Sequence, residues 1–192
     1  ERAADLLEVE RVSVWEFTAD RKALVCLDLF VRATRAHERP GPVSSCPRYL
    51  ATLESSLTLA ADDACRDPRT SELADSYLRP LGITSMLDAP IRRDGPLVGV
   101  VCHEHIGPIR QWLLDEKSFA ASIADMVTRA LTDDRRRRLT AALAHSEERY
   151  RTYVSISTEA ILGAEFDPPV QTDLPLEQQA DAVTARAVIV EC

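Results

Sequence analysis

Glycine is scarce in this chain of 192 residues, in which it occurs only six times. A loop that cradles phosphate groups needs closely spaced glycines, because its backbone must approach the phosphate oxygens. The sequence has no such loop and therefore gives no support to a nucleotide-binding parallel sheet. It also has neither an apolar stretch long enough to cross a membrane nor a basic, apolar leader. We therefore expect no membrane partner.

Cysteines are few, odd in number and scattered along the chain. None forms a Cys-x-x-Cys pair, so the pattern argues against both a disulfide framework and a structural zinc site. Isolated thiols of this kind are typical of buried, reduced cysteines in a cytoplasmic protein, which is the localisation we expect. The five positions are Cys26, Cys46, Cys65, Cys102 and Cys192.

Positive charge is in the minority. With 23 basic and 31 acidic residues the net charge is −8, which disfavours general attraction to nucleic acid or to an anionic membrane. The one basic run, Arg135 to Arg138, follows Asp133 and Asp134 at the spacing of ion pairs within a helix. We interpret this run as a solvent-exposed helix face and expect no nucleic-acid partner.

The first two thirds of the chain contain the patterns of a sheet with helices. Residues 9–17 and 23–31 favour two strands, and residues 83–92 and 97–106 favour two more around a turn at 93–96. Short connections favour antiparallel neighbours. The predicted fold class is α+β, with an antiparallel sheet sandwiched by helices and followed by a long C-terminal helix.

Smaller elements are predicted between these strand pairs. Proline and glycine punctuate residues 32–46 and indicate a loop, after which we predict a short helix over 47–53 and a strand over 57–60. Asp67 stands where an N-cap is favoured, directly before a proline. This arrangement predicts a helix over 68–78.

The segment between Pro108 and Gly163 contains neither glycine nor proline. A helix over 115–154 would be ~60 Å long, whereas a compact domain of ~150 residues has a radius of gyration of only ~15 Å. Such a helix must protrude, break or pair with another chain. Its second half has an imperfect apolar stripe, and we expect a homodimer through the 115–154 helix. The stripe contains Leu139, Leu143, Tyr150, Tyr153 and Val154.

Several stretches of the sequence resemble a known family. They are GVVCHEH (99–105), GPIRQW (107–112), FAASIADMV (119–127) and DPRTSELADSYLRPLGITSMLDAPI (67–91). These stretches resemble the GAF domain, a small-molecule sensing module of bacterial sensor proteins such as sensor histidine kinases. The resemblance implies a GAF sensory domain over residues 1–131.

A second resemblance follows the first. The segments SEERYR (146–151) and TYVSISTEAI (152–161) are similar to the start of a PAS domain, another sensing fold. We therefore expect a helical linker over 132–150 and a truncated PAS start over 151–192. The chain is then expected to be a piece of a longer signal-transduction protein with a downstream kinase or cyclase domain.

The GAF resemblance implies a ligand pocket between the sheet and the helices on one of its faces. Asp88 stands out, since a lone acid in an apolar strand needs a partner when buried. Arg110 and Trp112 are expected to anchor the loop before the long helix. The candidate pocket residues are Trp15, Tyr49, Leu53, Tyr77, Met86, Asp88 and Cys102. We expect a non-catalytic module that binds a small ligand or partner and relays it through the dimerising helix.

Two other functions stay open. One is a purely structural dimerisation module whose pocket is filled by side chains, and a void of a few hundred Å³ would favour sensing over it. The other is a thiol-dependent reductase that pairs Cys46 with Cys65 or Cys102. The reductase requires two sulfur atoms within bonding reach.

Cofactor chemistry centres on Cys102, His103 and His105. In a strand the two histidines share one face and Cys102 points to the other, so no third ligand accompanies the histidines. We favour hydrogen bonding at the end of the strand. In GAF modules that bind a bilin, the cysteine lies on a helix or loop, whereas Cys102 is expected on a strand. The sequence motif of cyclic-nucleotide-binding GAF domains is missing from this chain.

The three aspartates of the loop before residue 68 are more typical of a helix cap and a solvated loop than of a cation site. They are Asp62, Asp63 and Asp67. We expect no metal, no cofactor and no catalytic residue.

Overall fold

The computed structural model describes residues 1–44, 46–156, 163–166, 178 and 187–191. The chain divides into two compact units, residues 1–135 and residues 136–192. Each unit is described by itself.

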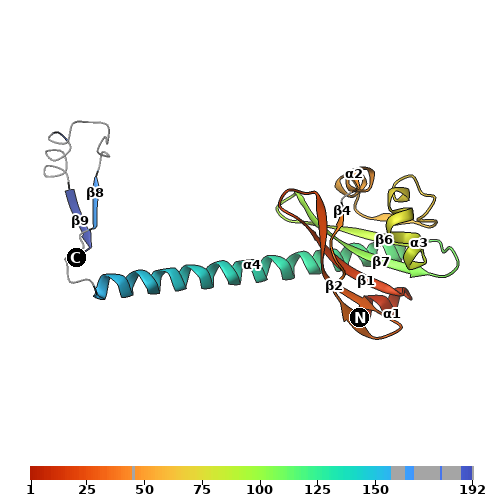
Figure 1. Cartoon of the computed structure of the whole chain (residues 1–192), viewed down its shortest axis with the longest axis horizontal. Helices are drawn as coiled ribbons and strands as arrows, with labels where there is room; N and C mark the ends of the chain where they lie inside the picture. The colour runs from red at the N-terminus through yellow and green to blue at the C-terminus, as the bar shows by residue number, and fades with distance from the viewer. Residues whose placement is uncertain (45, 157–162, 167–177, 179–186, 192) are drawn as a thin grey trace. The chain divides into compact units, whose positions relative to one another are not determined.

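Unit 1 is built on a seven-stranded sheet (Figure 1). The strands are β1 (Arg11–Phe17), β2 (Ala23–Val31), β3 (Ala36–Glu38), β4 (Val43–Ser44), β5 (Leu59–Ala61), β6 (Ile83–Arg92) and β7 (Leu97–Ile106). Their order is β3-β2-β1-β7-β6-β5, with β4 paired to β2. Every pair is antiparallel. With the helices described below, this confirms the predicted α+β fold.

Strands β6 and β7 form a hairpin that lies between β1 and β5 in the sheet. Its turn is closed by the Arg93 N–H, which donates to the Pro96 carbonyl at 2.9 Å. Asp94 and Gly95 adopt positive φ angles of 53° and 104° there, which glycine adopts freely and aspartate tolerates. The resulting register places Asp88 directly opposite Cys102.

Strands β7 and β1 approach each other closely at Gly99. A Cβ atom built on Gly99 would lie 2.2 Å from the carbonyl oxygen of Trp15. A side chain at this position would therefore force the two backbones apart.

Helices cover both faces of the sheet (Figure 1). The first face packs against α2 (Pro47–Ser55) and a short helical segment, and the second packs against α1 (Arg2–Leu7) and the first turns of α4 (Leu114–Ile156). The short segment combines a 3₁₀ turn η1 (Ser71–Leu73), a π-helical turn η2 (Ala74–Leu78) and α3 (Arg79–Leu81). Alternation along β7 places Val100 and Cys102 in the first core and Val101 in the second.

Three predictions about small elements need correction. Residues 32–46 contain β3 and β4, which pair with β2, because strands of three and two residues are too short to show alternation. The strand predicted over 57–60 lies at 59–61 instead, as β5. Helical structure begins at Ser71 rather than after Asp67, since residues 68–70 form a turn that is closed onto the Asp67 carbonyl.

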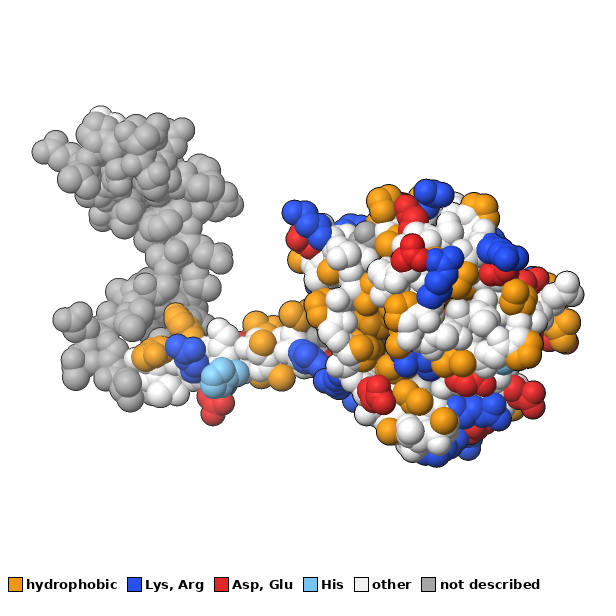
Figure 2. All heavy atoms as spheres, turned by 45° about the vertical axis from the view of Figure 1, so that its right-hand side comes forward, with side chains coloured by type: hydrophobic (Ala, Val, Ile, Leu, Met, Phe, Trp, Pro, Cys, Tyr) orange, Lys and Arg blue, Asp and Glu red, His pale blue; other side chains and the backbone are white. Residues whose placement is uncertain are grey.

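The long helix α4 is a single element of 43 residues. In unit 1 it buries Ala120 and Ala124 against the second core. Every residue from 132 to 153 is exposed, including Leu139 and Leu143, each 62% exposed. Figure 2 shows hydrophobic side chains along this part of α4. Among the described residues, no helix is both long and apolar enough to cross a membrane.

Unit 2 contains one described pair of strands. β8 (Gly163–Phe166) and β9 (Ala187–Glu191) run antiparallel. The PAS start predicted over 151–192 lies largely outside the described residues.

Candidate functional site

A small cavity lies in the first core of unit 1, between the sheet and the helical segments α2, η1 and η2. Its volume is about 30 Å³, whereas sites for drug-sized ligands have roughly 300–1,000 Å³. The walls are almost wholly apolar. They consist of Trp15, Leu24, Val43, Tyr49, Leu73, Tyr77, Val100 and Cys102.

The predicted pocket residues divide into those that line the cavity and those that do not. Leu53 and Met86 are buried in the same core without lining the cavity, and Asp88 contacts Tyr49 in the layer around it. Four further lining residues were not predicted, although alternation with Cys102 along the strand indicates Val100: they are Leu24, Val43, Leu73 and Val100. The predicted residues that line the cavity are Trp15, Tyr49, Tyr77 and Cys102.

Asp88 is fully buried in β6 and is held by a helix. The Tyr49 hydroxyl in α2 donates to Asp88 Oδ2 at 2.5 Å and lies 3.8 Å from Cys102 Sγ. Burial raises the pKa of Asp88 to about 7, and the negative charge of Glu104 acts in the same direction. The Tyr49 hydrogen bond opposes this rise because it stabilises the carboxylate.

A second buried acid, Glu104, lies two residues beyond Cys102 on the same face of β7. Arg11 Nε donates to its Oε2 at 2.8 Å, and the Tyr77 hydroxyl donates to its Oε1 at 2.8 Å. Burial raises the pKa of Glu104, while the Arg11 charge lowers it. Glu104 was not among the predicted site residues, although strand alternation places it beside Cys102 on the same face of β7.

The thiols are not prepared for nucleophilic chemistry. Burial raises the pKa of Cys102 well above its ordinary value, and the pKa of Cys26 to about 11. Burial also raises the pKa of Cys46. These thiols are therefore protonated at neutral pH, whereas a reactive cysteine must be a thiolate. No disulfide joins the four described cysteines, so the structure adds nothing in favour of the reductase.

The histidines of β7 lie against acceptor groups of the protein itself. His103 is buried, and its Nδ1 donates to the Leu87 carbonyl at 2.9 Å. Burial lowers the pKa of His103 to about 4, so its ring is neutral. His105 Nδ1 lies 3.0 Å from Glu10 Oε2. Within the described part of the chain, no group of three His, Cys, Asp or Glu residues is arranged to hold a metal ion.

The loop between β7 and α4 is fixed by Arg110. Its guanidinium lies 4.5 Å from the centre of the Trp112 ring and donates to the Leu7 carbonyl at 2.7 Å. It also forms an ion pair with Glu116 in the first turn of α4. Arg110 therefore connects α1, the loop and α4.

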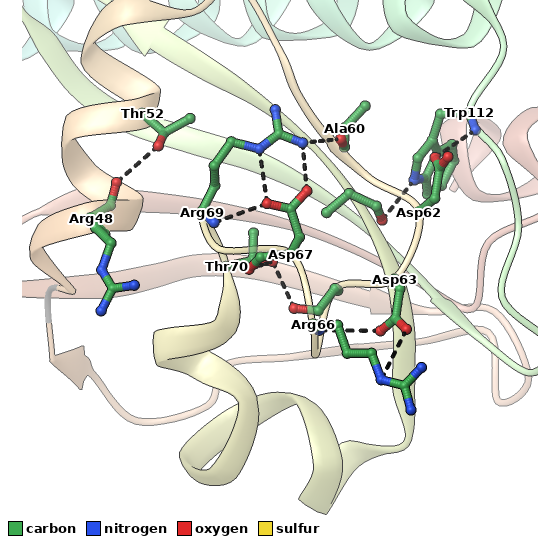
Figure 3. Close-up of polar contacts among 12 residues, drawn as sticks. Arg48, Thr52, Ala60, Asp62, Asp63, Arg66, Asp67, Arg69, Thr70 and Trp112 are labelled. Atoms are coloured by element: carbon green, nitrogen blue, oxygen red, sulfur yellow. Dashed lines mark hydrogen bonds and ion pairs between the residues drawn. The ribbon is translucent and has the colours of Figure 1, made fainter.

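The acidic loop after β5 is held by protein donors (Figure 3). Asp62 Oδ1 accepts the backbone N–H of Trp112 at 3.1 Å, so this loop also holds the start of α4. The Arg69 side chain binds both oxygens of Asp67, at 2.9 and 2.6 Å. Asp63 accepts a backbone N–H at 3.2 Å. These contacts account for the three carboxylates without a bound cation.

Comparison with known proteins identifies the family. The model of the GAF domain family matches residues 1–131, and the chain therefore belongs to the GAF domain family. No curated protein matches it by sequence.

Solved structures share the fold. The GAF domain of Thermosynechococcus elongatus PixJ, in its blue-light absorbing form, is 20% identical, with a TM-score of 0.58 over 75% of this chain and 87% of that one. A domain of a putative two-component sensor histidine kinase from Sinorhizobium meliloti 1021 is 14% identical, with a TM-score of 0.56 over 73% and 90%. The GAF domain of a phosphoenolpyruvate-protein phosphotransferase from Coxiella burnetii is 16% identical, with a TM-score of 0.53 over 72% and 80%.

Proposed function

We propose that unit 1 is a non-catalytic sensory module of a cytoplasmic signal-transduction protein. A small ligand or partner binds in the cavity of the first core. Binding changes the packing of α4, the helix through which two copies of the chain form a homodimer. The solved structures with this fold include a photoreceptor and a domain of a sensor histidine kinase, which agrees with a sensory role. In the proposed longer protein, the segment after α4 begins a PAS domain.

One observation carries this proposal: strand β7 contributes to both cores. Cys102 and Val100 face the cavity, and Val101, between them, packs in the core that buries Ala120 and Ala124 of α4. Close-packed interiors transmit displacements because they have little free volume. A ligand that shifts β7 would therefore change how α4 packs against the second core.

The relay requires two packings of similar stability. A ligand shifts the population toward the packing that it binds more tightly. The two packings would differ in the contacts that fix the start of α4. These are the contacts of Arg110 with Leu7 and Glu116 and the contact of Trp112 with Asp62. Leu139 and Leu143, exposed on the second half of α4, would be covered in the homodimer.

A structural dimerisation module is the second candidate, and the size of the cavity favours it. About 30 Å³ holds little more than a water molecule, so side chains nearly fill the pocket. In this alternative α4 forms the dimer and the cavity binds nothing.

Native mass spectrometry of the purified chain separates the two candidates. The sensory proposal predicts a dimer that carries a retained small molecule, which is released when the protein is denatured. A dimer without additional mass, whose thermal unfolding is unchanged by a panel of small metabolites, would support the structural module. A monomer would contradict both.

A further inference from the structure

The two tyrosines that line the cavity direct their hydroxyl groups to buried acids. The Tyr49 hydroxyl donates to Asp88 Oδ2 at 2.5 Å, and the Tyr77 hydroxyl donates to Glu104 Oε1 at 2.8 Å. Neither Asp88 nor Glu104 is among the residues that line the cavity. The tyrosines therefore present their rings to the cavity, while their polar atoms are bound to groups outside its walls.

The remaining polar side chains of the wall are also bound within the protein. Trp15 Nε1 donates to the Ser13 hydroxyl at 2.8 Å. Cys102 Sγ lies 3.8 Å from the Tyr49 hydroxyl oxygen, and a thiol is only a weak donor and acceptor. The other described wall residues are aliphatic. The described walls of the cavity therefore offer an occupant carbon atoms and aromatic rings, and no side-chain hydrogen bond is left for it.

These walls select against charged and strongly polar occupants. An ion or a polar molecule would lose its hydration on entry and gain no compensating hydrogen bond from the described wall side chains. An apolar molecule gains instead, because its transfer out of water is favourable and the packed walls add dispersion contacts. Enclosed spaces with walls of this kind stay dry and take up apolar guests.

The cavity also sets the size of its occupant and its route of entry. A volume of about 30 Å³ accommodates a molecule of only a few heavy atoms. Of the described wall residues, six are buried, whereas Val43 and Tyr77 are half-buried. Val43 belongs to β4, a strand of two residues that pairs with β2. The path from solvent to the cavity therefore lies between β4 and the π-helical turn η2 that carries Tyr77.

We propose that the cavity binds a small uncharged apolar molecule, such as a short hydrocarbon, between the aromatic rings and the aliphatic side chains of Leu73 and Val100. The inference rests on the proposed function, in which this cavity is the ligand site, and it names the chemical class of the ligand. Asp88 and Glu104 do not contact the occupant. They fix the orientation of the two tyrosine rings through the hydroxyl groups.

Xenon tests the proposal, because it is uncharged, apolar and small enough for apolar protein cavities. Methyl signals of the isotope-labelled full chain are recorded by NMR under xenon and under helium at the same pressure. We expect xenon to shift the methyl signals of four wall residues with a saturable dependence on pressure, and to leave those of Val101 in the second core unchanged. The four are Leu24, Val43, Leu73 and Val100. Unchanged wall signals, or equal shifts at Val101, would overturn the proposal.

Polar probes of similar size test the selectivity of the cavity. Methanol and methylammonium chloride are titrated against the same methyl signals. Because the described wall side chains leave no hydrogen bond for these molecules, we expect no saturable shift of the wall methyl groups with either probe. A saturable shift with methanol or methylammonium would show that the cavity accepts polar molecules and would overturn the apolar assignment.

Matched variants locate the bound xenon. Val100→Ile adds a methylene to the cavity wall and should abolish the xenon shift at Leu73. Val98→Ile makes the same change at a half-buried position of β7 that packs against the second core, and it should retain the shift. A shift that persists in Val100→Ile would place xenon elsewhere and overturn the assignment. If Val100→Ile does not fold, Leu73→Ala is the second test. It enlarges the cavity and should raise the affinity for xenon several-fold, and an unchanged affinity would overturn the assignment.

Two further measurements separate this inference from the sensory proposal. If xenon leaves the wall signals unchanged and native mass spectrometry detects a retained polar or charged molecule, the apolar assignment is wrong and the sensory module stands. If xenon shifts the wall signals and hydrogen exchange at Ala120 and Ala124 of α4 stays unchanged, the ligand class stands and the relay to α4 is wrong. If neither a retained molecule nor a xenon shift is found, both are wrong.

Discussion

The hydroxyl of Tyr49 donates a 2.5 Å hydrogen bond to Asp88 Oδ2, and this contact joins α2 to the middle of strand β6. A buried carboxyl group is stabilised in its ionised form by such a donor and destabilised by the loss of water. At Asp88 the loss of water dominates. The charge at this position is therefore sensitive to pH.

Asp88→Asn should remove a loss of stability that accompanies rising pH between about 4 and 7. Because burial raises the pKa of Asp88 from 3.8 to about 7, the folded state holds a proton that the unfolded state releases. The contribution of this group is present at low pH and is lost as the pH rises toward 7, with a slope of up to about 1.4 kcal/mol per pH unit. Urea unfolding between pH 5 and 9 measures the slope. An unchanged slope in the variant would contradict this assignment.

His103→Asn should remove a slope of the opposite sign. Burial lowers the pKa of His103 from 6.5 to about 4, so the unfolded state binds a proton that the folded state excludes. Stability is then lost as the pH falls from about 6.5 toward 4. Asparagine can still donate to the Leu87 carbonyl. Comparing Asp88→Asn with the double variant by urea unfolding isolates the histidine, and parallel pH profiles would refute its role.

Gly99→Ala should destabilise the pairing of β1 and β7. A Cβ at this position would lie 2.2 Å from the Trp15 carbonyl oxygen, and overpacking of this kind costs about 1–3 kcal/mol. Gly41→Ala is the matched control, because no atom lies within 4 Å of the Cβ that it adds. The free energies of unfolding come from urea titrations. Equal stabilities of the two variants would show that the strands can separate without cost.

Arg110→Ala should weaken the attachment of α4. The substitution removes the Glu116 ion pair, the donor to the Leu7 carbonyl and the contact with Trp112. We expect a loss of about 1–3 kcal/mol, since these hydrogen bonds are charged and partly buried. Arg66→Ala is the control, because the Arg66 side chain is 88% exposed. Hydrogen exchange in the first turns of α4 should increase in Arg110→Ala alone.

Leu143→Glu should dissociate the proposed homodimer. Leu143 is 62% exposed on α4, and like charges facing each other across a helix pair would repel. Leu57→Glu is the control, since Leu57 lies in unit 1 and is 85% exposed. Sedimentation equilibrium should give half the mass for Leu143→Glu only. If both variants remain dimeric, the interface lies elsewhere.

The long elements were predictable because their side-chain patterns extend over many residues. The bounds predicted for β2, β6 and β7 agree with the structure, and the range predicted for α4 agrees to within two residues. The segment after Asp67 was harder, because it changes from a 3₁₀ turn to a π turn and then to an α turn within residues 71–81. Side-chain periodicity does not distinguish three backbone hydrogen-bond patterns over so short a distance.

The site shows what local patterns cannot supply. Asp88 could be selected as a lone acid in an apolar strand, but its partner Tyr49 lies 39 residues earlier in the chain. Glu104 and Arg11 are 93 residues apart, so their ion pair is visible only when β7 lies beside β1. Candidate site residues can be predicted from the sequence, whereas their hydrogen-bond and ion-pair partners depend on how the strands and helices pack.

The short helix α1 matters more than its six residues suggest. Ala4 and Leu7 are buried beneath the sheet, and the Leu7 carbonyl receives Arg110, which also holds the first turn of α4. Removing α1 would take away the Leu7 carbonyl that Arg110 contacts and the buried side chains of Ala4 and Leu7 in the second core. Shortened versions made for biophysical work should therefore retain α1, because without it Arg110 and the first turn of α4 lose this contact.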